Sequence, residues 1–130
     1  MNPHYQRVKN LLLDLDVIII KESPRDELFV IENESAGIKN MIIGVAEPIV
    51  IVEQFICRIA TPTVQIYESL LKKNRDIIHG AFVLDDTSRK LIFRDTLQVS
   101  NLDSNELEAT INSLSLLLSE YSDQLIQFTK

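Results

Sequence analysis

The sequence has 130 residues, of which 45% are hydrophobic and 25% are charged, and its formal net charge is −6. These values are ordinary for one folded domain and exclude an intrinsically disordered chain. They also disfavour a nucleic-acid-binding protein, because phosphate binding depends on clustered lysine and arginine, and the 13 basic residues are scattered. We therefore expect a single domain over residues 1–130.

The cysteine count and the apolar runs bear on the cellular compartment. The single cysteine cannot form an internal disulfide, which favours a reducing compartment. The N-terminal stretch lacks the long apolar region and the small-residue cleavage site of a signal peptide. The longest apolar runs are shorter than the roughly 20 residues that a membrane span needs. We expect a cytoplasmic protein that binds neither membrane nor nucleic acid.

The first half of the chain is predicted to hold one helix and four strands. Asn2 can cap a helix over residues 3–14, with Pro3 at its first position. Runs rich in β-branched residues then predict strands, and a short connection between the first two indicates antiparallel pairing. The predicted strands cover residues 17–20, 28–31, 40–45 and 49–59.

The middle of the chain is predicted to form a helix followed at once by a strand. Thr61 is expected to be the N-cap and Pro62 the first helical residue, where its missing N–H is not needed. Gly80 opens an alternating run, so we expect a strand over residues 77–84, and a hairpin loop leads to another over residues 90–97. The expected apolar face of the helix consists of Val64, Tyr67, Leu70 and Leu71.

The last element is predicted to be a long helix. Asp103 with Glu106 three residues later resembles a capping box. Apolar residues then recur at alternating spacings of four and three, as along one continuous helix. This stripe is the candidate interaction surface: Leu107, Ile111, Leu114, Leu118, Tyr121, Leu125 and Phe128. The full order α-β-β-β-β-α-β-β-α predicts an α+β fold with an antiparallel sheet packed by helices.

Residue types that carry catalysis or bind metals form no recognisable constellation in the sequence. The two histidines stand beside no cluster with metal-ligand spacing, and Cys57 lies in an apolar strand like a small buried hydrophobe. Glu53 lies between apolar residues of the same strand, and an ion pair with Arg58 or Arg94 explains it without acid–base chemistry. We expect no enzyme activity, no cofactor and no metal site.

The apolar content exceeds what the predicted helices can cover. Residues 17–20 and 49–59 are apolar on both faces of their strands, and the stripe of the last helix is wider than a coiled-coil seam. Three helices cover one face of such a sheet, so an exposed apolar surface is expected unless the sheet curls and buries it. This predicts a protein-binding module that forms a homodimer. The alternative function is a sensory domain that binds a small molecule between the last helix and the sheet.

A local motif in the middle of the chain resembles a known group. Residues 67–75 read YESLLKKNR, and residues 80–85 read GAFVLD. A helix with a Leu-Leu-x-x-Asn-like end that leads into a Gly-x-Phe-x-Leu-Asp-like strand resembles the type III secretion chaperones and the YbjN-like bacterial proteins. The order of elements is similar to theirs over most of the chain.

The resemblance implies a small, acidic, cytoplasmic and non-enzymatic protein, often a homodimer, that binds another polypeptide. In the secretion chaperones, an extended segment of the partner wraps over apolar patches on the sheet and helices. The four strands predicted before the central helix depart from the usual three, so no partner-binding residue is carried over. Asn74 and Gly80 are expected to shape the helix-to-strand corner, and Phe82 and Leu84 to fill the core.

Overall fold

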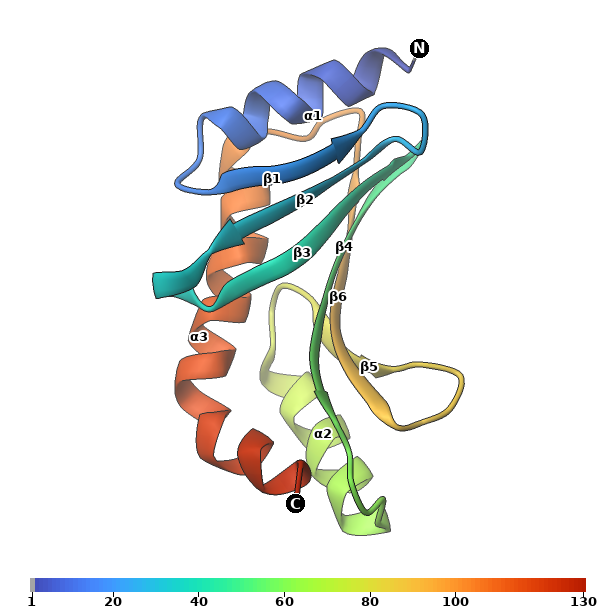
Figure 1. The fold of residues 1–130 in the computed structure, drawn as a ribbon, viewed down its shortest axis with the longest axis vertical. Coiled ribbons are helices and arrows are strands. Elements are labelled where there is room, and N and C mark those ends of the chain that lie inside the picture. Colours follow the sequence, from blue (N-terminus) through green and yellow to red (C-terminus); the bar gives the residue numbers. More distant parts are fainter. Residues whose placement is uncertain (1) are drawn as a thin grey trace.

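The computed structural model describes residues 2–130 and shows one six-stranded antiparallel sheet with three α-helices in that range (Figure 1). The helices are α1 (Pro3–Leu13), α2 (Val64–Asp76) and α3 (Ser104–Phe128). The strands are β1 (Ile18–Ser23), β2 (Leu28–Asn33), β3 (Ile38–Ala46), β4 (Ile49–Arg58), β5 (Ala81–Leu84) and β6 (Lys90–Gln98). The predicted fold class and order of elements are confirmed, and a short 3-10 turn, η1 (Glu34–Ala36), is added between β2 and β3.

The strand order in the sheet is β1-β2-β3-β4-β6-β5. The first four strands form a meander in which each strand pairs with the next along the chain. β6 then returns to lie beside β4, and β5 pairs with the outer edge of β6. The connection from β4 to β5 runs through α2. In this strand order the two edge strands are β1 and β5.

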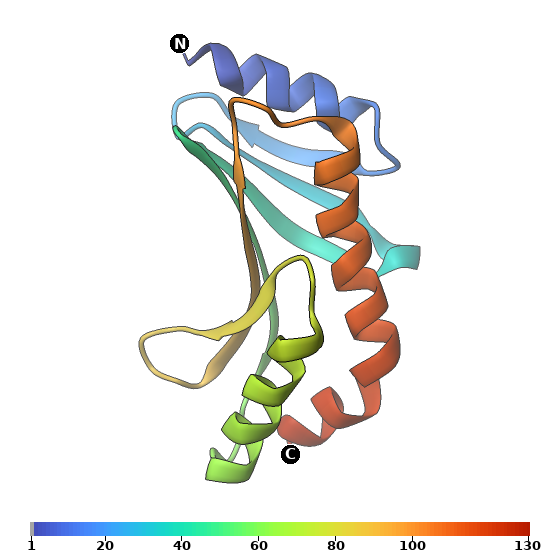
Figure 2. The ribbon, with the colours of Figure 1, turned by 180° about the vertical axis from the view of Figure 1, so that it is seen from behind.

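The helices α2 and α3 lie on one side of the sheet, and α1 lies along its β1 end. In Figure 1 the strands β2 and β3 pass in front of α3, and the reverse view in Figure 2 shows α3 and α2 in front of the strands. We call the helix-covered side the inner face and the opposite side the outer face. No helix within residues 2–130 covers the outer face of β2 and β3 (Figure 1).

The core lies between the inner face and the helices. α1 is held there by Tyr5, whose ring stacks on that of Phe29 with the ring centroids 4.5 Å apart. Arg7 of the same helix donates to the carbonyl of Leu102 at 2.8 Å, which ties α1 to the start of α3. The strand side chains of this core with no exposed surface are Phe29, Ile31, Ile38, Met41, Ile43, Val50, Val52, Leu91 and Phe93.

The predicted N-caps of α1 and α3 are confirmed, and the predicted N-cap of α2 is wrong. Asn2 accepts from the N–H of His4 at 2.9 Å, and Asp103 accepts from that of Glu106 at 2.8 Å. The N-cap of α2 is Thr63, not Thr61, and the hydroxyl of Thr63 accepts from the N–H of Ile66 at 3.2 Å. Pro62 therefore precedes the helix. Both threonines are good capping residues, so local preference alone does not choose between them.

The buried face of α2 also differs from the predicted one. Val64 and Leu71 are 74% and 71% exposed, whereas Leu70 and Lys73 are buried. The helix is rotated because Asn74, one turn after Leu70, forms two hydrogen bonds with the backbone of β5. That contact turns the side carrying Leu70 toward the sheet and the side carrying Leu71 toward solvent.

The strand after α2 begins later than predicted, at Ala81 instead of Ile77. Gly80 has φ +88°, which interrupts extended geometry, and the N–H of Ile77 still donates to the carbonyl of Asn74. In the strand itself, Phe82 is buried as expected. Leu84 is 38% exposed and does not fill the core, because it lies at the end of a four-residue edge strand.

Candidate interaction surface

The outer face of the sheet carries a continuous row of paired residues across its centre. Ile42 of β3 is opposite Glu53 of β4, and Glu53 is opposite Arg94 of β6. The carboxylate of Glu53 forms an ion pair with the guanidinium of Arg94, which is one of the two predicted partners. Because directly opposite residues project to the same side of a sheet, these side chains share one face. A charged pair therefore lies between Ile42 on one side and Ala81 of β5 on the other.

Apolar side chains surround this ion pair on the outer face. Ile42 is 45% exposed and Phe55 is 55% exposed. Phe55 is opposite Ile92 of β6, which in turn is opposite Val83 of β5, so the apolar surface extends toward the β5 end. At the other end of the sheet, Ile18 and Ile20 of β1 are exposed. The outer face therefore carries exposed apolar side chains on β1, β3 and β4, together with polar ones such as Lys21 and Glu32.

The stripe predicted on α3 is divided between core and surface. Four of its members are buried against the sheet in the single subunit: Leu107, Ile111, Leu114 and Leu125. The other three, Leu118, Tyr121 and Phe128, are half-buried and border the core. Leu118 lies over the turn at Gly37 and lines a pocket with Phe55 and Ile56 at the sheet edge. The half-buried members are therefore the part of the stripe that another molecule can reach.

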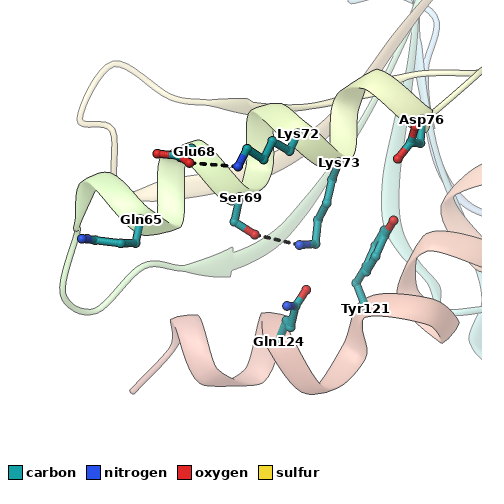
Figure 3. A pocket seen from close by; sticks show the side chains of 8 residues that line it. All are labelled: Gln65, Glu68, Ser69, Lys72, Lys73, Asp76, Tyr121 and Gln124. Atoms are coloured by element: carbon teal, nitrogen blue, oxygen red, sulfur yellow. Dashed lines mark hydrogen bonds and ion pairs between the residues drawn. The ribbon is translucent and has the colours of Figure 1, made fainter.

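A pocket with a volume of about 550 Å³ lies between α2 and the C-terminal part of α3 (Figure 3). Tyr121 of the predicted stripe forms part of its wall, together with Ser69 and Lys73 of α2. The Nζ of Lys73 donates to the Oγ of Ser69 at 2.7 Å and lies 4.9 Å from the centroid of the Tyr121 ring. The sequence analysis missed Lys73, although its position three residues after Leu70 places both on one helix face.

The pockets that border α3 have volumes between about 350 and 550 Å³ and all open to solvent. A small-molecule site is typically an enclosed, mostly apolar cavity with a few converging polar groups. The geometry therefore favours a surface for a large partner over the alternative of a bound metabolite.

Cys57, the nucleophile type considered for catalysis, lies in β4 against α3. Cys57 is half-buried under Leu125, with its sulfur 3.9 Å from the Leu125 carbonyl oxygen, and burial raises the pKa of its thiol. A raised pKa reduces the thiolate fraction at neutral pH, which makes the sulfur a poor nucleophile. No group of three or more His, Cys, Asp or Glu side chains suited to a metal ion occurs within residues 2–130. None of the helices in the same range is long and apolar enough to cross a membrane.

One hydrogen-bond network joins α1 to the edge strand β1. The hydroxyl of Tyr5 donates to Glu22 at 2.9 Å, and Lys9 donates to the other oxygen of Glu22 at 3.0 Å. Burial, and then the bond to Glu22, raise the pKa of Tyr5 to about 12. The bonds from Lys9 and Tyr5 hold the pKa of Glu22 below its usual value. Glu22 is opposite the buried Phe29, so the network fixes α1 to β1 on the inner face.

Comparison with known proteins decides the family. The CesT_Tir_1 model, which describes a family of type III secretion chaperones, matches residues 1–130. The chain belongs to this family. Secretion chaperones are non-enzymatic proteins that bind other polypeptides, in agreement with the expected protein-binding role. No significant match was found among curated protein sequences.

Solved structures share the secretion-chaperone-like fold. YbjN from E. coli, described as a putative transcription regulator, superposes with a TM-score of 0.74 and 14% identity over 94% of this chain and 93% of that chain. The ExsC–ExsE complex gives a TM-score of 0.58 and 14% identity over 93% and 95% of the two chains. The chaperone SycH from Yersinia pestis, in complex with a fragment of YscM2, gives 0.57 and 15% over 96% and 98%. At these identities the similarity shows the fold alone.

Proposed function

We propose that this protein is a chaperone-like or regulatory module that acts as a homodimer and binds a partner polypeptide through exposed apolar surface of its sheet and helices. The observation that carries the proposal is the uncovered outer face, where Ile42 and Phe55 are about half exposed beside the Glu53–Arg94 pair. An apolar patch rimmed by polar groups is typical of an interaction site.

The size of the outer face is compatible with a stable interface. A standard protein interface buries about 800 Å² on each partner, which is roughly a tenth of the surface of a small protein. The accessible surface of this subunit is 7719 Å². All six strands contribute apolar side chains to the outer face: Ile18, Leu28, Val30, Ile42, Ile51, Phe55, Val83 and Ile92. The Glu53–Arg94 pair at the centre would fix the register of two copies.

The α3 stripe supplies a second part of the proposed surface. Leu118, Tyr121 and Phe128 are half-buried in the single subunit and lie in the C-terminal half of α3. A partner segment that runs along α3 would complete their burial. In ExsC–ExsE and in SycH with its YscM2 fragment, a protein of this fold is in complex with another polypeptide, which supports a protein partner here. We propose that the single α+β domain performs this role in the cytoplasm.

The mass of the protein in solution tests the homodimer directly. Light scattering coupled to size-exclusion chromatography is expected to give a mass near twice 14.9 kDa. A mass of 14.9 kDa that persists at high micromolar concentration contradicts the homodimer. Copurification from native lysate, followed by mass spectrometry of the bound polypeptide, then identifies the partner.

A further inference from the structure

Lys73 is a buried cation without an ion-pair partner. It is 9% exposed, and within residues 2–130 no carboxylate oxygen lies within ion-pair distance of its Nζ. The two carboxylates nearest to it along α2 are engaged elsewhere. Glu68 pairs with Lys72 at 3.0 Å, and Asp76 lies 3.9 Å from Arg75. The positive charge of Lys73 is therefore not offset by an anion of its own chain.

The ammonium group of Lys73 has unused hydrogen-bonding capacity. It carries three N–H donors, and Ser69 accepts one of them. The face of the Tyr121 ring, 4.9 Å away, stabilises the charge but accepts no strong hydrogen bond. Figure 3 shows Lys73 reaching from α2 toward α3, with Gln124 across the gap. Because a buried charge is costly unless it is paired and hydrogen-bonded, the pocket is suited to a ligand that supplies acceptors.

The charges around the pocket favour a singly charged anion. Lys72 and Lys73 supply two positive charges, and Glu68 and Asp76 at the same pocket supply two negative ones. A phosphate dianion would be repelled by both carboxylates, whereas one carboxylate adjacent to Lys73 restores a neutral pair. The amide of Gln124 can donate to the second oxygen of such a group. The lining therefore fits a carboxylate better than a phosphate.

We propose that this pocket binds a carboxylate presented by an aspartate or glutamate side chain of a partner polypeptide. This inference rests on the proposed function, because it assigns the partner one acidic side chain at a defined place. The peptide groups beside such a side chain add contacts that a free small anion lacks, so a carboxylate within a polypeptide is favoured over a dissolved one. The volume of about 550 Å³ also leaves room for the peptide groups on either side of that side chain.

The test uses N-acetyl-L-glutamic acid α-amide, which presents one side-chain carboxylate between two peptide groups. Binding to the full chain is followed by NMR, through the side-chain signals of Lys73, Gln124 and Tyr121. The uncharged glutamine analogue is the ligand control. We expect saturable shifts of these three residues with the glutamate compound and none with the glutamine analogue.

Two variants with the same change of charge separate the pocket from the rest of the surface. Gln124→Glu places a carboxylate beside Lys73, whereas Gln127→Glu adds one further along α3, where the side chain is also exposed. Gln124→Glu is expected to weaken binding by more than about tenfold, and Gln127→Glu by less than about twofold. Both positions are exposed, so neither variant is expected to unfold the protein. Lys73→Met, checked for folding by circular dichroism, is expected to abolish the shifts of Gln124 and Tyr121.

The outcomes are distinct. The proposal is overturned if the glutamate compound gives no saturable shift at these residues, or if Gln127→Glu weakens it as much as Gln124→Glu. If acetate binds saturably and the glutamate compound does not, the pocket takes a small free carboxylate, and the proposal that a polypeptide supplies the carboxylate is wrong. Because the probe is small and the measurement needs no second protein, the result is independent of the homodimer. A monomer that binds the compound would contradict the proposed function and leave the pocket assignment intact.

Discussion

The side chain of Asn74 pairs with the backbone of Phe82 in both directions. Its Oδ1 accepts from the N–H of Phe82 at 2.8 Å, and its Nδ2 donates to the carbonyl of the same residue at 3.0 Å. Phe82 faces Phe93 of β6 on its other side, so Asn74 occupies the place of a further strand at the β5 edge. This contact attaches α2 to the sheet and explains how the predicted corner is built.

Replacing Asn74 by alanine is expected to destabilise the protein by about 2–3 kcal/mol, because it leaves both backbone groups of Phe82 without a partner. Asn74→Asp keeps an acceptor for the N–H but loses the donor, so an intermediate loss is expected. Urea unfolding followed by circular dichroism measures both. Asn101→Ala, in an exposed turn, serves as the control. Equal stabilities of Asn74→Ala and the control would contradict the assigned role.

Gly80 is expected to tolerate no side chain. Its φ of +88° is unfavourable for other residues, and a Cβ atom there would overlap the ring of Phe93, which has no exposed surface. Gly80→Ala should therefore lower the free energy of unfolding by roughly 2 kcal/mol or more. The matched control is Gly44→Ala, where the nearest atom to a new Cβ is the Ile51 carbonyl oxygen at 4.0 Å. Thermal unfolding of the two variants should separate them clearly, and similar midpoints would refute this account of the corner.

The contribution of Tyr5 to the free energy of unfolding is expected to decrease at alkaline pH. Burial raises the pKa of its hydroxyl from 10.0 to about 12, so the folded state holds the proton more tightly than the unfolded state. This contribution is fully present below pH 10.0 and is lost as the pH rises toward about 12. The difference in urea midpoint between the wild type and Tyr5→Phe should shrink across that interval. A constant difference from neutral to strongly alkaline pH would show that the Tyr5 hydroxyl titrates normally.

Charge introduced on the outer face is expected to prevent self-association without unfolding the subunit. Ile42→Lys combined with Phe55→Lys places two cations on this half-exposed surface, and residue 42 lies opposite Glu53, which can accept the new charge. Light scattering should give 14.9 kDa for the double variant. Val64→Lys, at an exposed apolar position on α2, is the control and should leave the dimer intact. If only Val64→Lys dissociated the dimer, the interface would lie on α2 and not on the sheet.

Much of the fold could be predicted from local patterns. β-branched runs and helical spacing are properties of short segments, so the order of elements and the caps Asn2 and Asp103 followed from the sequence. The cap of α2 did not, because Thr61 and Thr63 offer equivalent hydroxyls. The rotation of α2 is set by the bonds between Asn74 and Phe82, which are tertiary contacts that helical spacing does not contain.

The candidate site was predicted less completely than the fold. The excess of apolar residues indicated an uncovered surface, but it could not divide the α3 stripe into the buried Leu114 and the reachable Leu118. That division depends on tertiary contacts, which bury Leu125 further along the helix although Leu118 is only half-buried. The sequence did not mark Lys73, since a lysine near a helix C-terminus is usually solvated. Its burial arises from Tyr121 on a distant helix, which only the folded chain brings near.

The pairing of β4 with β6 has a consequence for how the chain is made. The earlier strands pair with immediate neighbours in the chain, but β4 receives its second neighbour only when the segment from Ile49 to Gln98 closes. During synthesis β1 to β4 leave the ribosome before β6 has been made. The edge of β4 that later pairs with β6 therefore stays without a hydrogen-bonded neighbour while α2 and β5 emerge. An apolar, unpaired strand edge is a template for wrong pairing. The nascent half-sheet is therefore the stage at which this protein most needs protection from its neighbours.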